Sequence, residues 1–342
     1  MQEFTFGIVT YNQEKIILET LESIKYQIQK YGEGKRMNLV VSDDCSNDRT
    51  TTLVEYWLKK NRKIFNEATV YKSDINKGVS ENFSFIMNKI QTKYYKLIAG
   101  DDLFSSHNIF DYIVNDDNIH VFLKLCFRDG KVKYNKIELA NHFYYWKIFK
   151  HTNKKDIRLV AGISPYATPE LFIDKDYFST DCFEFISQYR NYEDDPYLYY
   201  ILKNNPKAKF VYHSIPMQLY RQSDNALTSG IPSIHQILFL DDMHKFRKLL
   251  LFEEKNFFFK MFRFFEVIDS FLMKHRFDAS KCIDRVIIKN KKRRNENIAN
   301  KNKDFSNYIQ SIDQIITEEE KYIINIKENA EKCMSEFIES LL

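Results

Sequence analysis

The first hundred residues alternate between two kinds of apolar pattern, and this alternation restricts the fold more than any other feature. Short runs rich in β-branched and aromatic residues alternate with longer segments whose apolar residues recur at helical spacing. The predicted strands are residues 4–10, 38–42, 68–72 and 94–99, and the predicted helices are residues 14–30, 50–60 and 78–90. Strands joined by such helices predict an α/β fold with a Rossmann-like, mostly parallel central sheet and right-handed crossovers.

Polar motifs follow three of these predicted strands. Thr10, Tyr11 and Asn12 come at the end of the first strand, Asp43-Asp44 at the end of the second, and Asp101-Asp102 after the fourth. The carboxyl ends of parallel strands lie at one edge of the sheet, and ligands of such folds bind there. We therefore expect these side chains to share one ligand site.

The motif Gly100-Asp101-Asp102 directly follows a short apolar run. Two adjacent carboxylates at a strand end repel each other and are costly to desolvate unless a positive charge lies beside them. A divalent cation bound to a phosphorylated ligand would supply that charge. Taken alone, the motif is more typical of a solvated turn, and the motifs upstream are what favour the metal site.

Two further segments have a structural and a functional interpretation. A carboxylate at Asp43 or Asp44 could accept a hydrogen bond from a nucleobase N–H, while the polar residues that follow could simply cap the next helix. Asn76, Gly78 and Asn82 lie in a turn that enters a helix. They could contact a ribose diphosphate or only begin that helix.

In order and spacing, these segments resemble the inverting family 2 glycosyltransferases of the GT-A fold. Residues 40–50 resemble the family's nucleotide-binding signature Asp-Asp-x-Ser-x-Asp-x-Thr, and Gly100-Asp101-Asp102 resembles its metal-binding acidic motif. The likeness is strong over residues 4–104 and weaker to about residue 230. The family often has another Asp where this chain has Ala99. The resemblance therefore implies Asp102 as the ligand of Mn²⁺ or Mg²⁺, with Asp101 contacting ribose or a metal-bound water.

The resemblance also implies catalytic residues in the second half. The family takes its general base from a Glu-Asp pair, and residues 190–197 match it, so that Asp194 is the predicted base and Glu193 its neighbour. The structural alternative is a helix that begins just before Pro196. Arg221 matches a Tyr-Arg segment that closes over the diphosphate, but Ser223 stands where many members carry a His, which leaves a third protein ligand unassigned.

Charge divides the chain into three parts. Residues 1–242 are neutral, residues 243–305 carry 17 basic and 8 acidic residues, and residues 306–342 carry 3 basic and 8 acidic residues. We predict a GT-A domain over 1–235, with a nucleotide-binding half (1–104) and an acceptor half (105–235). A basic helical extension (236–305) follows, which includes a polar linker over 289–303. The terminal helix (306–342) has an apolar stripe suited to a coiled coil and a homodimer.

The basic segment interleaves phenylalanines with lysine and arginine. The favoured interpretation is an amphipathic helical subdomain whose Phe face packs on the body. The alternative is a peripheral contact with a membrane surface. No nucleic-acid-binding module is recognisable, and we expect no nucleic-acid partner.

The sequence thus predicts a metal-dependent inverting glycosyltransferase. By resemblance it transfers a sugar from a nucleotide-sugar, expected to be a UDP-sugar, to a glycan or lipid-linked acceptor in bacterial surface polysaccharide synthesis. Neither an apolar run of about 18 residues nor a basic leader is present, and the five cysteines are scattered. We expect a cytoplasmic protein, with any membrane contact at the inner face.

Two alternatives belong to other classes. A catalytically degenerate sugar-nucleotide-binding scaffold is suggested by Ala99 and Ser223. A nucleotidyltransferase would normally carry a Gly-rich phosphate loop with Lys or Arg near the N-terminus, and the sequence has none.

Overall fold

The core of the molecule is a four-stranded parallel sheet with helices on both faces. The computed structural model describes residues 2–114, 116–134, 139, 143, 168–205, 207–222, 234–274 and 303–341. The strands of this sheet, in the order β3-β2-β1-β4, are β1 (Gln2–Thr10), β2 (Lys35–Asp43), β3 (Glu67–Lys72) and β4 (Tyr94–Ala99). The helices between them are α1 (Ile17–Tyr31), α2 (Thr50–Asn61) and α3 (Val79–Lys89). The α/β fold with a parallel central sheet is therefore confirmed.

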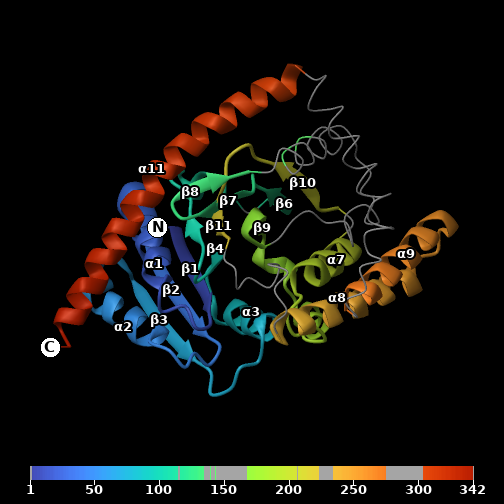
Figure 1. Ribbon diagram of the computed structural model, residues 1–342, viewed down its shortest axis with the longest axis horizontal. Helices are drawn as coiled ribbons and strands as arrows, with labels where there is room; N and C mark the ends of the chain where they lie inside the picture. Colours follow the sequence, from blue (N-terminus) through green and yellow to red (C-terminus); the bar gives the residue numbers. More distant parts are fainter. Residues whose placement is uncertain are drawn as a thin grey trace.

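The sheet order explains why α1 and α2 lie on one face and α3 on the other (Figure 1). Right-handed crossovers from β1 to β2 and from β2 to β3 run in one direction, and the crossover from β3 to β4 runs back. β1, β2 and β4 are largely buried, which is why they read as nearly continuous apolar runs, whereas the edge strand β3 alternates between exposed and half-buried residues. Phe6, Ile8 and Leu39 are at most 1% exposed and form part of the core.

Beyond residue 100 two small mixed sheets extend the fold. One has the order β5-β11-β7-β8, with strands Leu103–Phe104, Gln218–Arg221, Leu125–Arg128 and Lys131–Lys133. The other has the order β10-β6-β9, with strands Lys209–Tyr212, Asn118–Val121 and Leu171–Ile173. The loose pattern of residues 105–230, with short strands and many aromatics, predicts an antiparallel extension, and this prediction is only partly right. β11 pairs with β7, and β10 with β6, in parallel.

In the second half of the described residues, four α-helices precede the terminal helix. They are α6 (Thr180–Ile186), α7 (Asp194–Asn204), α8 (Ile234–Glu253) and α9 (Phe257–Lys274). α8 and α9 form an antiparallel hairpin that projects at the edge of the molecule (Figure 1). The expected helical character of residues 236–274 is confirmed, and residues 275–302, including most of the predicted linker, lie outside the described residues.

The favoured packing of the Phe face on the body is wrong for the phenylalanines that are exposed, and the side chains of Phe258 and Phe262 lie outside the described residues. We use the name Phe face for the outer side of α9 that carries Phe257, Phe264 and Phe271. Phe257, Phe264 and Phe271 of α9 are between 47% and 71% exposed. The side of α9 that is buried instead carries polar residues, which hydrogen-bond to α8.

The terminal helix α11 (Lys303–Glu339) runs along the outer side of α1 and α2 (Figure 1). Its buried stripe joins two hydrophobic clusters, one around the parallel sheet and one around β7 and β8. This stripe consists of Ile312, Tyr322, Ile323, Ile326, Ala330, Cys333 and Phe337. The apolar face predicted to suit a coiled coil is thus occupied within the same chain. A homodimer through this helix stays a prediction and would have to use its other face.

Within the described residues, no helix is both long enough and apolar enough to cross a bilayer.

Candidate active site

The polar motifs predicted at strand ends do meet at one edge of the parallel sheet. Thr10 at the end of β1 is the register partner of Asp43 at the end of β2, and Val9 is the partner of Ala99 at the end of β4. The backbone continues this pairing past the strands, because Asp44 N–H donates to Thr10 O and Gly100 N–H donates to Val9 O, each at 2.9 Å.

The loop after β1 is bound to the loop after β2. Asn12 adopts a left-handed conformation (φ 53°), which Asn tolerates better than most residues. Its backbone N–H donates to Ser46 Oγ at 2.8 Å, and its side-chain oxygen accepts from Asn47 N–H at 2.9 Å. Thr10 is buried and donates to Gln13 Oε1 at 2.7 Å, whereas the Tyr11 side chain is 36% exposed. Of the three predicted residues here, Tyr11 and Asn12 are exposed to a ligand and Thr10 is not.

The carboxylates of Asp43 and Asp44 are buried and bind the chain on either side of them. Asp43 accepts from the backbone N–H and the hydroxyl of Ser46, as a helix-capping loop would require. Asp44 accepts from the backbone N–H groups of Lys77 and Gly78, each at 2.8 Å. Asp44 therefore fixes the turn before α3 against the end of β2.

The turn before α3 also contacts the second half of the chain. Asn76 accepts two hydrogen bonds from Arg190, at its side-chain oxygen (2.7 Å) and its backbone oxygen (2.9 Å). Gly78 has φ 93°, and a Cβ placed there would lie 2.6 Å from Arg190 Cγ and 2.7 Å from Arg190 O. Only glycine fits this approach. Asn82 is different, since its amide donates to Ser42 O and its oxygen accepts from Ser42 Oγ.

The acidic motif holds an acceptor atom without a partner. Asp102 is 1% exposed, and its Oδ1 accepts from the backbone N–H of Arg221 at 2.8 Å. Its Oδ2 is buried and has no hydrogen-bond partner. Gly100 permits the close approach to the start of α1, because a Cβ there would lie 2.9 Å from Thr10 Oγ1 and 2.9 Å from Ile17 Cδ1. A buried, unsatisfied carboxylate oxygen is costly unless it binds something.

The electrostatics of the motif favour a cation. Burial raises the pKa of Asp102 well above its usual range, and the neighbouring Asp101 raises it further. Burial likewise raises the pKa of Asp101, and the Arg221 guanidinium lowers it. Bound positive charge would stabilise both carboxylates in their ionised form.

Arg221 is committed to holding this motif. Its Nε donates to Asp101 O and its Nη2 forms an ion pair with Glu19 Oε2, each at 2.6 Å. The guanidinium also lies 4.4 Å from the centre of the Phe127 ring. The structure thus brings Arg221 to the acidic motif, as expected from the sequence, with several of its donors already used.

The predicted base lies at the start of α7. Asp194 Oδ1 accepts from Thr168 N–H at 3.0 Å and from the Thr168 hydroxyl. Burial raises the pKa of Asp194, whereas Thr168, Lys124 and Lys96 lower it. Burial, Asp194 and Asp195 together raise the pKa of Glu193 well above its usual range. Of the two, Asp194 is the one oriented by neighbours that favour its ionised form.

Two lysines that the sequence interpretation did not single out connect the two acidic motifs. Lys96 in β4 is 2% exposed and donates to Thr168 O (2.9 Å) and Leu171 O (2.7 Å). Burial lowers its pKa to about 7. Lys124 forms an ion pair with Glu170 at 3.3 Å and lowers the pKa of both Asp102 and Asp194. Lys96 was detectable as a lysine inside a buried strand, since such a residue needs acceptors that the strand does not provide, whereas Lys124 lies outside the strands and had no such signal.

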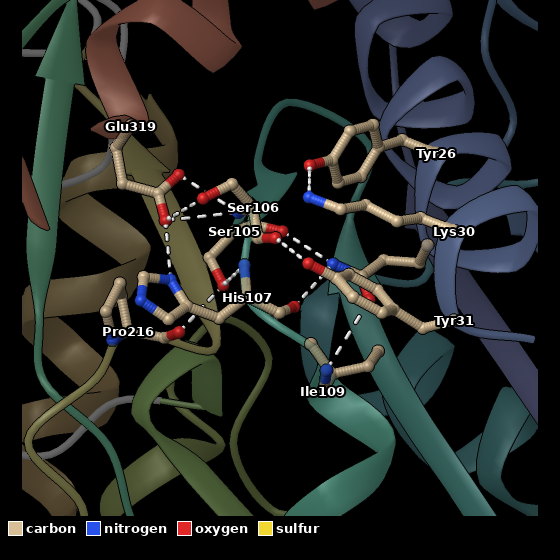
Figure 2. Close-up of polar contacts among 10 residues, drawn as sticks. Tyr26, Lys30, Tyr31, Ser105, Ser106, His107, Ile109, Pro216 and Glu319 are labelled. Atoms are coloured by element: carbon tan, nitrogen blue, oxygen red, sulfur yellow. Dashed lines mark hydrogen bonds and ion pairs between the residues drawn. The ribbon is translucent and has the colours of Figure 1, made fainter. Parts of the chain in front are cut away.

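The segment after Asp102 is anchored by α11 (Figure 2). Glu319 is fully buried. Its carboxylate accepts hydrogen bonds from the N–H and the hydroxyl of Ser106 and pairs with His107 Nδ1, each at 3.0 Å. Tyr31 donates to Ser106 O at 2.8 Å from the α1 side, and Gln27 of α1 donates to Ser105 O at 2.6 Å. The chain that leaves the acidic motif is therefore clamped between α1 and α11.

The residues present fit a divalent cation that takes most of its oxygen ligands from a bound phosphorylated molecule and from water. Asp102 Oδ2 offers one buried oxygen, and Mg²⁺ or Mn²⁺ prefers oxygen ligands and often takes the rest from phosphate and water. Among the described residues, no group of three or more His, Cys, Asp or Glu side chains could hold a metal by itself. Ser223, at the position where a further ligand was looked for, lies outside the described residues. His213 packs on Phe122 and His120 and takes no part in this site.

Comparisons with known proteins agree with this fold. Residues 5–168 match the family model Glycosyl transferase family 2. S. aureus TarS, residues 1–349, in complex with UDP-GlcNAc is similar in structure, with a TM-score of 0.52 and 15% identity over 95% of this chain and 84% of that one. The same TarS fragment in another crystal structure gives a TM-score of 0.51 and 17% identity, over 82% and 75%.

A mannosyltransferase from Pyrobaculum calidifontis, in complex with GDP-Man and Mn²⁺, has a TM-score of 0.49 and 14% identity over 96% of this chain and 86% of that one. A search of the curated proteins by sequence found no match. At these identities the structural likeness concerns the fold.

Proposed function

The chain carries a glycosyl transferase family 2 domain with a GT-A fold and is a glycosyltransferase, and from this premise we propose that it is metal-dependent and inverting. The proposed donor is a UDP-sugar, and the proposed acceptor is a glycan or lipid-linked glycan used in building a bacterial surface polysaccharide. The observation that carries the proposal is the buried acidic pair at the end of β4, with the unpartnered Oδ2 of Asp102.

Nucleotide binding would use the edge formed by the strand ends. Tyr11 offers an exposed ring, Asp43 offers a buried carboxylate for a base N–H, and Asp44 holds the turn with Asn76 and Gly78 beside them. A divalent cation held through Asp102 would offset the charge of the diphosphate and so favour its departure. The UDP donor is supported by the family resemblance and by the UDP-GlcNAc complex of TarS, which has the same fold.

The chemistry asked of the protein residues is acid–base and positioning. The acceptor oxygen forms a bond to the anomeric carbon from the face opposite the leaving group, and its proton passes to the carboxylate of Asp194. The bond from the anomeric carbon to the diphosphate oxygen breaks as the new bond forms, and the nucleoside diphosphate leaves. Thr168 orients Asp194, and burial raises its pKa, which makes the carboxylate a stronger base toward the acceptor proton.

The test separates binding from turnover. UDP-sugars and GDP-sugars are screened with Mn²⁺ for the compound that raises the melting temperature of the protein. That compound is then used as the donor, and turnover is measured as the release of its nucleoside diphosphate. Asp102→Asn should abolish the metal-dependent thermal shift and lower turnover roughly 10²–10³-fold. Asp194→Asn should keep the thermal shift and lower turnover roughly 10²–10⁴-fold.

Asp111→Asn, at an exposed position in the same half of the protein, is the matched control and should change neither measurement. Full turnover in both active-site variants would refute the proposed roles. Metal-dependent donor binding without turnover in the wild-type chain would instead support the scaffold alternative.

A further inference from the structure

Lys96 is a buried cation within the parallel sheet. It lies on β4, where Phe6 of β1 is its register partner, and it is 2% exposed. Its ammonium group donates to two backbone oxygens, Thr168 O at 2.9 Å and Leu171 O at 2.7 Å. A buried ammonium group costs folding free energy that an apolar side chain at the same place would not. The packing of the sheet therefore does not account for this residue.

One of the two acceptors of Lys96 belongs to the residue that holds Asp194. Thr168 donates its backbone N–H (3.0 Å) and its hydroxyl to Asp194 Oδ1. The hydroxyl also pairs with the Tyr197 hydroxyl at 3.0 Å. Lys96 thus binds the carbonyl oxygen of the same residue whose N–H and hydroxyl bind the predicted base. Without the ammonium group, Thr168 would lose a contact that fixes it to β4.

Lys96 also acts on Asp194 through its charge. Burial raises the pKa of Asp194, whereas the charges of Lys124 and Lys96 lower it. Burial lowers the pKa of Lys96 to about 7, and Asp194 opposes this shift. Lys124 is partly exposed and forms an ion pair with Glu170 at 3.3 Å, so that solvent screens its charge more than that of Lys96. Lys96 is thus linked to the base in two ways, by contact through Thr168 and by charge.

We propose that Lys96 is a positioning residue for the base, because it holds Thr168 by the carbonyl oxygen and so keeps the Asp194 carboxylate in one orientation. The inference rests on the proposed function, in which Asp194 accepts the proton of the acceptor. The structural alternative is that Lys96 only ties β4 to β9 through Leu171. A residue of that kind would affect the stability of the protein but not the chemistry of the folded enzyme.

The experiment compares Lys96→Met with Lys93→Met in the full chain. Methionine keeps much of the length of the side chain and removes its charge and its donors. Lys93 is exposed and lies just before β4, so it is the matched control. With Mn²⁺ and the UDP-sugar or GDP-sugar selected by thermal shift, Lys96→Met should lower kcat roughly 10–100-fold. It should leave the KM for that donor and the donor-induced thermal shift unchanged, and the control should match the wild type in all three.

The pH dependence of kcat is a readout that a purely structural role would not move. Against the effect of burial, the charge of Lys96 favours the ionised form of Asp194, so its removal should raise the pKa of the base. The acidic limb of the profile should therefore shift to higher pH by roughly 0.5–1 unit. The other titratable groups near the base stay in place in this variant: Lys124, Glu193, Asp195 and Tyr197.

A double variant shows whether Lys96 acts through Asp194. If it does, Lys96→Met combined with Asp194→Asn should turn over as slowly as Asp194→Asn alone. Losses that multiply in the double variant would show that Lys96 acts elsewhere and would overturn the proposal. So would an unchanged kcat and acidic limb in Lys96→Met, and that result would leave Asp194 as the base where Asp194→Asn has lost its turnover. Full turnover in Asp194→Asn would instead refute the proposed function, and this inference with it.

A second pair of variants applies if Lys96→Met does not fold. Thr168→Val keeps the carbonyl oxygen that Lys96 binds and removes the hydroxyl that binds Asp194, whereas Thr168→Ser keeps both. Turnover should fall roughly tenfold in the first variant and stay near that of the wild type in the second. Equal turnover in the two would overturn the link from Lys96 to the base through Thr168.

Discussion

Helices α9 and α11 are both amphipathic and both belong to the last third of the chain, yet they use their apolar faces in opposite ways. The α11 stripe is buried on α1, α2 and β8 and joins two hydrophobic clusters. The Phe face of α9 is exposed, and the buried side of α9 is polar. Helical periodicity predicts that a face is apolar, but it does not predict what that face contacts.

The polar residues on each helix account for the difference. Glu319 of α11 accepts hydrogen bonds from the chain beyond Asp102, and this places the apolar residues around it against the body. In α9 the polar partners are on α8, and they direct the phenylalanines outward. A few buried hydrogen bonds thus decide which way an amphipathic helix faces.

The largest effect is expected in the α11 stripe. Ile323 is 2% exposed and its neighbour Ile324 is 51% exposed. Ile323→Ala should lower the free energy of unfolding by about 2–5 kcal/mol, because it removes buried methyl groups and leaves a cavity. Ile324→Ala should change it by no more than about 0.5 kcal/mol. Denaturant unfolding of the two variants measures both, and equal effects would show that the stripe is not part of the core.

The next effect concerns the anchor of the acidic motif. Glu319→Ala removes the acceptor of the Ser106 N–H and hydroxyl, and should lower the free energy of unfolding by about 1–3 kcal/mol. It should also weaken the donor-induced thermal shift, because only the two residues of β5 separate Asp102 from residues 105–107. Glu318→Ala, at an exposed position one residue earlier, is the control. A Glu319 variant with unchanged stability and donor binding would contradict the clamp.

A smaller effect is expected where α9 is held to α8. Arg247→Met keeps most of the side-chain stem but removes the hydrogen bonds to Asp269 and to Glu266 O. The free energy of local opening of α9 should fall by about 1–2 kcal/mol, as measured by hydrogen exchange of its amides. Lys248→Met, at an exposed position on α8, should leave exchange unchanged. If α9 were held by apolar packing, both variants would behave alike.

The smallest effect is expected on the Phe face. Phe264→Ser should change the free energy of unfolding by no more than about 0.5 kcal/mol, because the ring is already half exposed. Thermal or denaturant unfolding in the absence of lipid makes the measurement. A loss of several kcal/mol would mean that the ring packs within the protein after all, and the contrast between α9 and α11 would disappear.

Local patterns predicted the parallel half of the fold closely. β4 has the predicted bounds, and the other strands and helices of the first hundred residues differ from prediction by a few residues at their ends. The reason is that β1, β2 and β4 are largely buried and each helix is buried on one face, so that burial leaves a regular pattern of apolar residues in the sequence. The short strands after residue 100 leave no such mark, and their mixed directions depend on contacts with distant segments.

The candidate site was predictable only in part, for a related reason. The motif residues follow strand ends, and the sheet brings them together. Lys96 and Lys124, in contrast, matter through acceptors on residues 168–171 and through charges on both acidic motifs. No local pattern encodes such contacts. The donor-binding and catalytic roles of the predicted residues stay predictions for the variants above to test.

The clamp on the acidic motif has a consequence for how the polypeptide is made. Glu319 lies 213 residues beyond Ser106 along the chain. At ordinary rates of translation a ribosome needs roughly 10–40 s to synthesise that interval. Throughout this time the faces of α1 and α2 that α11 will cover remain open to solvent. Chaperone binding to the nascent chain should therefore be strongest in this interval and should end once α11 has emerged.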